Sequence, residues 1–239
     1  MLAQLGLASR REAEAWIRAG RLTVNGTPAT LGLRVRLDDQ VRLDGRPVRR
    51  HALQQRRIFM CHRSPGTTLG QPQEESAMAS RLPTRAGRRF VAVSPMPRID
   101  GGLELLTSDG ELALKLQRAA HHLQCEFSVR VRGELNDAQR EGVMSGVLDR
   151  GAALSIESCE AAGGEGANRW YTLIARGGSG KDVRQLFERQ GALVSRVLRI
   201  RFGPLALPRL VARGQFRELT REETQMLIDA GADSQSSVR

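Results

Sequence analysis

Hydrophobic and polar positions along residues 1–53 predict one very small domain. Within residues 9–20, apolar side chains recur on one face at helical spacing, at Ala13, Trp16 and Ile17. This predicted helix carries a signal at each end, the S-x-x-E spacing of a capping box and then a glycine. A short strand with an Asn-Gly turn follows, and after it a strand–turn–strand unit around "DG". We therefore expect a small α/β domain.

From residue 54 the pattern is that of a larger domain, which we expect to extend to residue 230. Apolar strands come in runs with helices inserted, and the two do not alternate strictly. That order favours an α+β fold, with a mainly antiparallel sheet and flanking helices. The final segment, residues 231–239, is polar, and we expect it to be a disordered tail.

Charge changes the interpretation of the first domain. The net charge of the chain is +11, and residues 1–57 hold 12 arginines against 5 acidic residues. Such an excess favours a polyanionic partner, although a basic but otherwise ordinary enzyme is the alternative. Four arginines of the predicted helix and the strand after it are candidates for binding RNA phosphates, unless they form only a solvated helix face: Arg10, Arg11, Arg18 and Arg21.

Several classes of protein are disfavoured. No run of about 18 apolar residues predicts a transmembrane helix, and the N-terminus lacks a signal-peptide pattern, so we expect a cytoplasmic protein with no membrane partner. Three widely spaced cysteines fit neither a disulfide framework nor a zinc site, and we expect no metal. The segment "GGSGKD" fails as a nucleotide-binding loop, because Ala175 replaces its first glycine and Asp182 follows the lysine.

The stretch "SPMPRIDGGLELLTSDG" holds the clearest candidate for chemistry. Asp100 lies in a loop punctuated by prolines and glycines, directly before an apolar strand. Charged residues in such loops often mark a functional site.

The first domain resembles the small RNA-binding domain named after ribosomal small-subunit protein four. The match covers "LGLASRREAEAWIRAGRLTVNG" and "LGLRVRLDDQVRLDGRPV". The resemblance implies that the helix and the strand after it contact structured RNA. Most relatives have several more residues before this match, so we expect that part of the first helix is missing or that the chain starts upstream of Met1.

The second domain resembles the RsuA-like ribosomal RNA pseudouridine synthases, nearest to their large-subunit branch. The match rests on "GLELLTSDGELALKL", "CEFSVRVRGEL", "NRWYTLIARGGSGKDVRQLFERQGALVSRVLRIRFGPLALP" and "RGQFRELTREE". The resemblance implies isomerisation of uridine to pseudouridine in ribosomal RNA, without cofactor or metal, by a monomeric enzyme. An aspartate starts the reaction, an aromatic side chain packs on the flipped base, and a basic side chain pairs with the aspartate.

The aspartate motif departs from the family pattern R-L-D-x-x-T-x-G-L. When the flanking stretches are aligned without a gap, the family aspartate falls on Pro97, its arginine on Pro95 and its threonine on Asp100. On a strand, a shift of three residues spans about 10 Å and ends on the opposite face. A loop rich in proline and glycine can double back instead. We therefore take Asp100 as the candidate catalytic carboxylate, provided that the loop brings it to the family position.

The other two parts of the family site have partial matches. Phe127 stands at the aromatic position, where it can stack on a base or simply belong to the core. Arg184 matches the final arginine of G-R-N-R-E-V-R, and Lys181 replaces an inner one as a candidate RNA contact, while Ser179 and Gly180 replace an arginine and an asparagine. A buried arginine without a carboxylate partner is unfavourable, so Arg184 is expected to pair with Asp100 or another acid.

Three functions stay open from the sequence. The first is an active RNA pseudouridine synthase, and the second is a catalytically silent RNA-binding member of the same family that acts in ribosome assembly. The third is a generic RNA-binding module with no link to modification. Contact between the Asp100 carboxylate and the Arg184 guanidinium within one cleft favours the first function.

Overall fold

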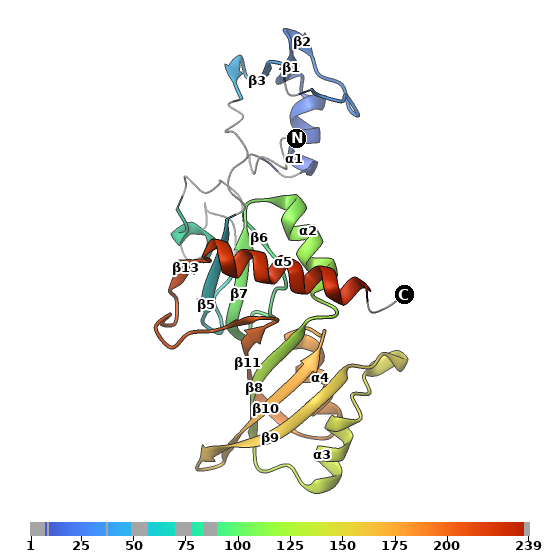
Figure 1. Ribbon diagram of the computed structural model, residues 1–239, viewed down its shortest axis with the longest axis vertical. Coiled ribbons are helices and arrows are strands. Elements are labelled where there is room, and N and C mark those ends of the chain that lie inside the picture. The colour runs from blue at the N-terminus through green and yellow to red at the C-terminus, as the bar shows by residue number, and fades with distance from the viewer. Residues whose placement is uncertain are drawn as a thin grey trace.

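The computed structural model describes residues 8, 10–36, 38–48, 57–69, 78–83 and 90–236, which form two separate sheets with five helices (Figure 1). The helices are α1 Arg10–Arg18, α2 Gly110–Ala119, α3 Asp137–Met144, α4 Gly180–Arg189 and α5 Arg221–Ser236. The strands of the small sheet are β1 Leu22–Val24, β2 Thr27–Pro28, β3 Val41–Leu43 and β4 Arg46–Pro47. Those of the large sheet are β5 Ile58–Arg63, β6 Val91–Ala92, β7 Gly101–Thr107, β8 Gln124–Arg132, β9 Ser155–Glu165, β10 Asn168–Arg176, β11 Leu193–Phe202, β12 Leu205–Ala206 and β13 Phe216–Glu218.

The small domain pairs helix α1 with a sheet in the order β2-β1-β3-β4. Among its described residues, those fully buried in the core are Ala8, Ala13, Leu22 and Val41. Both predicted turns are confirmed, because Asn25 and Asp44 have φ of 51° and 50° and the glycine after each is also left-handed, as tight hairpins require. The predicted capping box of α1 involves Ser9, which lies outside the described residues.

The main path of the large sheet has the order β13-β5-β7-β11-β8-β10-β9. Strands β7 and β11 run parallel, and the other paired strands are antiparallel. The predicted α+β class with a mainly antiparallel sheet is therefore confirmed. The parallel pair lies in the middle of the sheet. In its register the first residue of β7, Gly101, pairs with Leu198 in the middle of β11.

The two halves of the large sheet are covered differently. All seven residues of β7 are buried, because α2 and α5 pack on one face of this half and the short 3-10 helix η1 Met78–Arg81 packs on the other. Strand β8 instead alternates between buried and partly exposed residues. Its buried residues pack against α4, which leaves its other face open to solvent, as is usual in antiparallel sheets.

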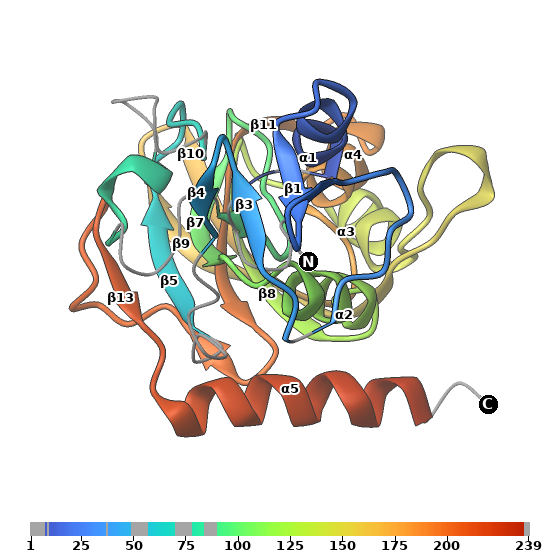
Figure 2. The same ribbon diagram turned by 90° about the horizontal axis from the view of Figure 1, so that it is seen from above.

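Helix α5 is longer than the sequence suggested. Its start is as predicted, since Glu223 N–H donates to Thr220 Oγ1 at 3.1 Å and Thr220 N–H donates back to the Glu223 carboxylate at 2.9 Å. Residues 231–236, expected to be disordered, continue the helix to Ser236. The reason is that Gly231 does not end the helix but lies where α5 crosses α2; a Cβ atom there would come within 2.8 Å of the Ala119 Cβ. Figure 2 shows the two helices side by side.

Helix α3 was not predicted, although its start has a sequence signal. Asn136 accepts a hydrogen bond from the Gln139 N–H, and the Gln139 side chain accepts one from the Asn136 N–H, which is a complete capping box. The helix buries only Val143, so its apolar face is too narrow to give a periodic pattern.

Candidate functional site

Asp100 and Arg184, 84 residues apart in sequence, form a bidentate ion pair. Arg184 Nη2 lies 2.5 Å from Asp100 Oδ1, and Arg184 Nε lies 3.3 Å from Oδ2. Asp100 reaches this position through a turn in which its N–H donates to the Pro97 carbonyl at 3.0 Å, immediately before β7. The expected pairing of Arg184 with Asp100 is therefore present, while the placement of Asp100 at the family position stays a prediction. Bidentate arginine–carboxylate pairs are among the strongest and most directional hydrogen bonds in proteins.

The carboxylate of this pair has no exposed surface. Asp100 is 0% exposed, and its Oδ1 also accepts a hydrogen bond from the Val197 N–H of β11 at 2.9 Å. The Arg184 side chain is 15% exposed, and its Nη1 donates to the Val194 carbonyl at 2.8 Å. Burial, the largest single effect, lowers the pKa of Arg184, but the hydrogen bonds and negative charges of Asp100 and Glu188 together outweigh it, so the pKa is raised overall. The pair therefore lies between α4, β11 and the start of β7.

A second buried charge cluster lies next to this pair. Glu104 of β7 is 0% exposed, and Arg63 of β5 and Arg199 of β11 are each 1% exposed. Arg63 Nε lies 3.1 Å from Glu104 Oε1, and Arg199 Nη2 lies 3.5 Å from Glu104 Oε2. Burial raises the pKa of Glu104, while Arg199 and Arg63 oppose the rise. A neutral Glu104 would leave two buried guanidinium charges without a counter-charge, which is the less favourable state.

The Arg63–Glu104–Arg199 cluster fixes the backbone of the loop before Asp100. Arg63 Nη2 donates to the carbonyls of Met96 and Pro97 at 2.9 and 2.8 Å, and the Met96 N–H donates to Glu104 at 2.8 Å. Arg199 Nη2 donates to the Ser94 carbonyl at 2.6 Å. Buried backbone groups outside a sheet need such partners, so the cluster replaces the strand pairing that the loop lacks.

Sequence reasoning missed this cluster, and a signal for it existed. Glu104 interrupts the apolar run "GLELLT", Arg63 ends the strand "IFMCHR", and Arg199 lies in "RVLRIRF" at an alternate position with the apolar Val197. Charged residues are almost never fully buried unless they are paired, so three of them in central strands predict one another.

The N-terminus of α4 is packed against the same loop. A Cβ atom on Gly180 would lie 2.3 Å from the Met96 Cε and 3.1 Å from the Pro97 Cδ. The glycine that replaces the family asparagine therefore makes room for the methionine and proline that replace the family leucine and aspartate. These departures from the family pattern fit one another in space.

Phe127, the candidate base-stacking residue, lies on β8. It is 0% exposed and belongs to the main core, because the alternation along β8 places it on the covered face with Cys125 and Val129. This burial favours the core alternative, and the base-stacking role stays a prediction. Lys181, by contrast, is exposed in the first turn of α4, three residues before Arg184.

The predicted RNA-binding arginines of the small domain lie on its surface. Arg11 is exposed, Arg18 pairs with Glu14 at 3.2 Å, and Arg21 Nη2 pairs with Asp44 at 2.5 Å. The side chain of Arg10 lies outside the described part of the structure. Two of these four arginines therefore already share their charge with a carboxylate.

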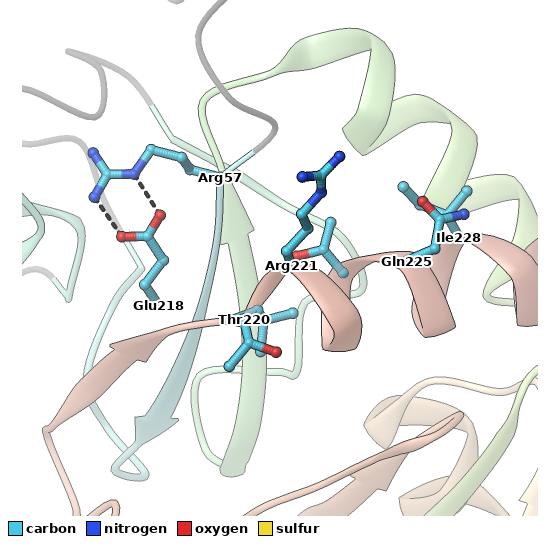
Figure 3. Close-up of a pocket in the computed structure, with 8 residues that line it drawn as sticks. Arg57, Glu218, Thr220, Arg221, Gln225 and Ile228 are labelled. Carbon is cyan, nitrogen blue, oxygen red and sulfur yellow. Dashed lines mark hydrogen bonds and ion pairs between the residues drawn. The ribbon is translucent and has the colours of Figure 1, made fainter.

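A cavity of about 470 Å³ lies elsewhere in the large domain (Figure 3). Arg57 and Glu218 form a bidentate pair on its wall, and Thr220, Arg221 and Gln225 line the side toward α5. Arg57 and Arg63 flank β5 at opposite ends, so this cavity is remote from Asp100. Among the described residues no three His, Cys, Asp or Glu side chains are grouped to hold a metal ion, and no described helix is long and apolar enough to cross a membrane.

Comparison with known proteins agrees with both domains. Residues 1–41 match the S4 domain family. The chain is 38% identical over 234 residues to ribosomal large subunit pseudouridine synthase B of Pseudomonas aeruginosa, covering 96% of this chain and 61% of that relative. It is 36% identical over 233 residues to the protein of the same name from Escherichia coli K12, covering 95% and 80% of the two chains.

A solved structure supports the fold independently. A crystal structure of a pseudouridylate synthase superposes with a TM-score of 0.62 at 18% identity, over 95% of this chain and 96% of that one. Identity above one third over most of the Escherichia coli relative goes further than a shared fold. The chain belongs to the family of ribosomal large subunit pseudouridine synthases.

Proposed function

We propose that this protein isomerises uridine to pseudouridine in ribosomal RNA, with Asp100 as the carboxylate that starts the reaction and Arg184 as its basic partner. The observation that carries the proposal is the bidentate contact between them, at 2.5 and 3.3 Å, in a chain similar to relatives named as pseudouridine synthases. The reaction needs a flipped uridine, so the RNA must be gripped on both sides of the target. Neither cofactor nor metal enters the proposal, and the protein acts as a cytoplasmic monomer.

Because Asp100 is fully buried, RNA binding has to uncover its carboxylate before the reaction can start. Of the two residues that donate to its carboxylate, Val197 uses a buried backbone N–H, whereas Arg184 is partly exposed. Displacement of the Arg184 side chain by RNA uncovers the carboxylate without breaking the sheet. An induced rearrangement of this kind couples catalysis to binding of the correct substrate.

The test is a map of pseudouridine in ribosomal RNA from cells that lack the gene. We expect one or more sites to disappear, to return with the wild-type gene, and to stay absent with Asp100→Ala. Asp100→Ala has to be checked for folding and RNA binding, so that loss of chemistry is separated from loss of the protein. An unchanged map in the deletion strain contradicts the enzyme.

A second candidate function is a catalytically silent RNA-binding member of the family that acts in ribosome assembly. The full burial of Asp100, with donors on both of its oxygens, favours it, because such a carboxylate serves as a structural anchor. Under this function the deletion strain keeps its pseudouridine map but accumulates incompletely assembled ribosomal subunits. Sucrose-gradient profiles of the same strain distinguish the two candidates.

A further inference from the structure

Arg196, Arg130 and Trp170 form a row across three neighbouring strands. Arg196 of β11 is opposite Arg130 of β8, and Arg130 is opposite Trp170 of β10. Residues directly opposite each other in antiparallel strands project from the same face of the sheet. Their sequence neighbours Val129, Tyr171 and Val197 are buried against the helices, so the row projects from the uncovered face.

The chemistry of the row suits an aromatic and anionic ligand. The Arg130 guanidinium carbon lies 5.7 Å from the centre of the Trp170 ring, and Arg130 Nε donates to Ser195 Oγ at 2.8 Å, which holds the guanidinium in place. A groove of about 490 Å³ opens beside them, bordered by the hairpin residues Gly164, Glu165 and Asn168. Within the described residues, Arg196 and the exposed Arg132, two positions along β8, have no carboxylate partner.

The row begins beside the Asp100–Arg184 pair. Arg196 directly precedes Val197, whose N–H binds Asp100, and Val194 accepts a hydrogen bond from Arg184. From there the row continues away from the site across β8 to β10, strands that lie side by side in the lower half of Figure 1. The row and helix α4 lie on opposite faces of the sheet, but β7 pairs with β11 only from Leu198 onward. An RNA chain that passes around the preceding residues of β11 meets Arg196 first and then Arg130 and Trp170.

We propose that this Arg196–Arg130–Trp170 row binds a single-stranded RNA segment next to the target nucleotide. A base stacks on Trp170 with its bound guanidinium, and Arg196 and Arg132 bind the flanking phosphates. Stacking on aromatic rings beside positive charge is the usual way in which proteins hold single strands without reading their sequence. A-form duplex RNA keeps its bases stacked inside and cannot offer one to a flat sheet. The choice of RNA as the ligand rests on the proposed function, but binding of RNA by the row does not require the protein to be catalytically active.

The test uses the fluorescence of Trp170 in the full-length protein. Trp16 is the other tryptophan of the chain, so Trp16→Phe leaves Trp170 as the single reporter. We expect an oligouridylate of about 10 nucleotides to quench this fluorescence as it binds. In the otherwise wild-type chain, Trp170→Ala is expected to weaken binding about tenfold and Trp170→Phe much less, because a phenyl ring still stacks. Trp170→Phe also keeps the test valid if Trp170→Ala does not fold.

The charge of the row is tested by Arg196→Glu, with Arg118→Glu as the matched control. Both variants change the net charge equally, since each replaces an arginine by a glutamate. Arg118 is exposed on α2, which packs on the covered face, so it lies away from the row. We expect Arg196→Glu to weaken binding and to flatten its salt dependence more than Arg118→Glu does.

Three outcomes overturn the inference. One is binding of the oligouridylate without quenching of Trp170, and another is equal weakening by the two charge reversals. The third is equally tight binding and quenching by a duplex of the same length, which would assign the surface to double-stranded RNA. If the pseudouridine map of the deletion strain is unchanged but Trp170 is quenched, the proposed enzyme activity is wrong and the inference about the row stands. If pseudouridine sites disappear from the map but Trp170 is not quenched, the activity stands and the inference about the row is wrong.

Discussion

Two regions at the start of β7 both bury a carboxylate, and they differ in what surrounds it. Asp100 has one arginine partner, which is 15% exposed, whereas Glu104 has two, each 1% exposed. The first pair can open when Arg184 moves toward solvent, but the second cannot open without unfolding the sheet. The loop before Asp100 is therefore anchored by the fully buried Arg63–Glu104–Arg199 cluster, whereas the Asp100 carboxylate is covered by the partly exposed Arg184.

The largest effect is expected for Glu104→Gln. The substitution preserves shape but leaves two buried guanidinium groups without a counter-charge, so the free energy of unfolding should fall by about 3–5 kcal/mol. Urea denaturation followed by circular dichroism measures the change. Glu126→Gln is the control, since its pair with Arg201 is partly exposed and is expected to matter little.

A small effect of Glu104→Gln would have a definite meaning. Glutamine imitates a protonated glutamate, so a change below about 1 kcal/mol, in the range of a single neutral hydrogen bond, would show that Glu104 is neutral in the fold. The view of Glu104 as a permanent ionic anchor would then be abandoned.

The second effect is that of Asp100→Asn on stability. The amide oxygen still accepts from the Val197 N–H, and the partly exposed Arg184 can turn to water, so we expect a loss of about 1.5–3 kcal/mol. The same denaturation experiment gives the value. If Asp100→Asn lowers the free energy of unfolding more than Glu104→Gln does, then Asp100 rather than Glu104 is the stronger structural anchor, and the contrast drawn between the two carboxylates is wrong.

Gly180→Ala tests how closely α4 and the loop are fitted. The new Cβ would meet the Met96 Cε at 2.3 Å, and the overpacking is expected to destabilise the protein by about 1 kcal/mol, since the end of a methionine side chain can shift. In a Met96→Ala background the same substitution should cost much less, because the obstructing methionine atoms are gone and only the Pro97 Cδ, at 3.1 Å, remains close. A double-mutant cycle from thermal unfolding measures this coupling, and additive effects would show that the two sites are independent.

The scaffold was predictable where one face of an element is apolar over its whole length. Strand β8 is such a case, and its alternation also places Phe127 on the covered face with Cys125 and Val129. The alternation predicts the burial of Phe127, whereas the base-stacking role rests on the family position alone. The Arg63–Glu104–Arg199 cluster was not predicted, because strand patterns do not tell which distant strands become neighbours. The Asp100–Arg184 contact depended on a turn that only the three-dimensional loop reveals.

The smallest effect on stability is expected at the Arg21–Asp44 pair, which has the geometry of the Asp100–Arg184 pair but lies on the protein surface. Arg21 binds Asp44 through Nε at 2.9 Å and Nη2 at 2.5 Å, a bidentate pair like that of Arg184 and Asp100, but its side chains are 46% and 49% exposed. Asp44→Asn should leave the thermal midpoint unchanged, because water replaces the lost partner and asparagine tolerates the left-handed turn at this position. Its one effect should be slightly tighter RNA binding with a steeper salt dependence, as Arg21 becomes free for a phosphate. If Asp44→Asn destabilises the protein as much as Asp100→Asn does, bidentate geometry rather than burial determines the strength of both pairs. The contrast between the Asp100 and Glu104 carboxylates would then rest on their number of arginine partners alone.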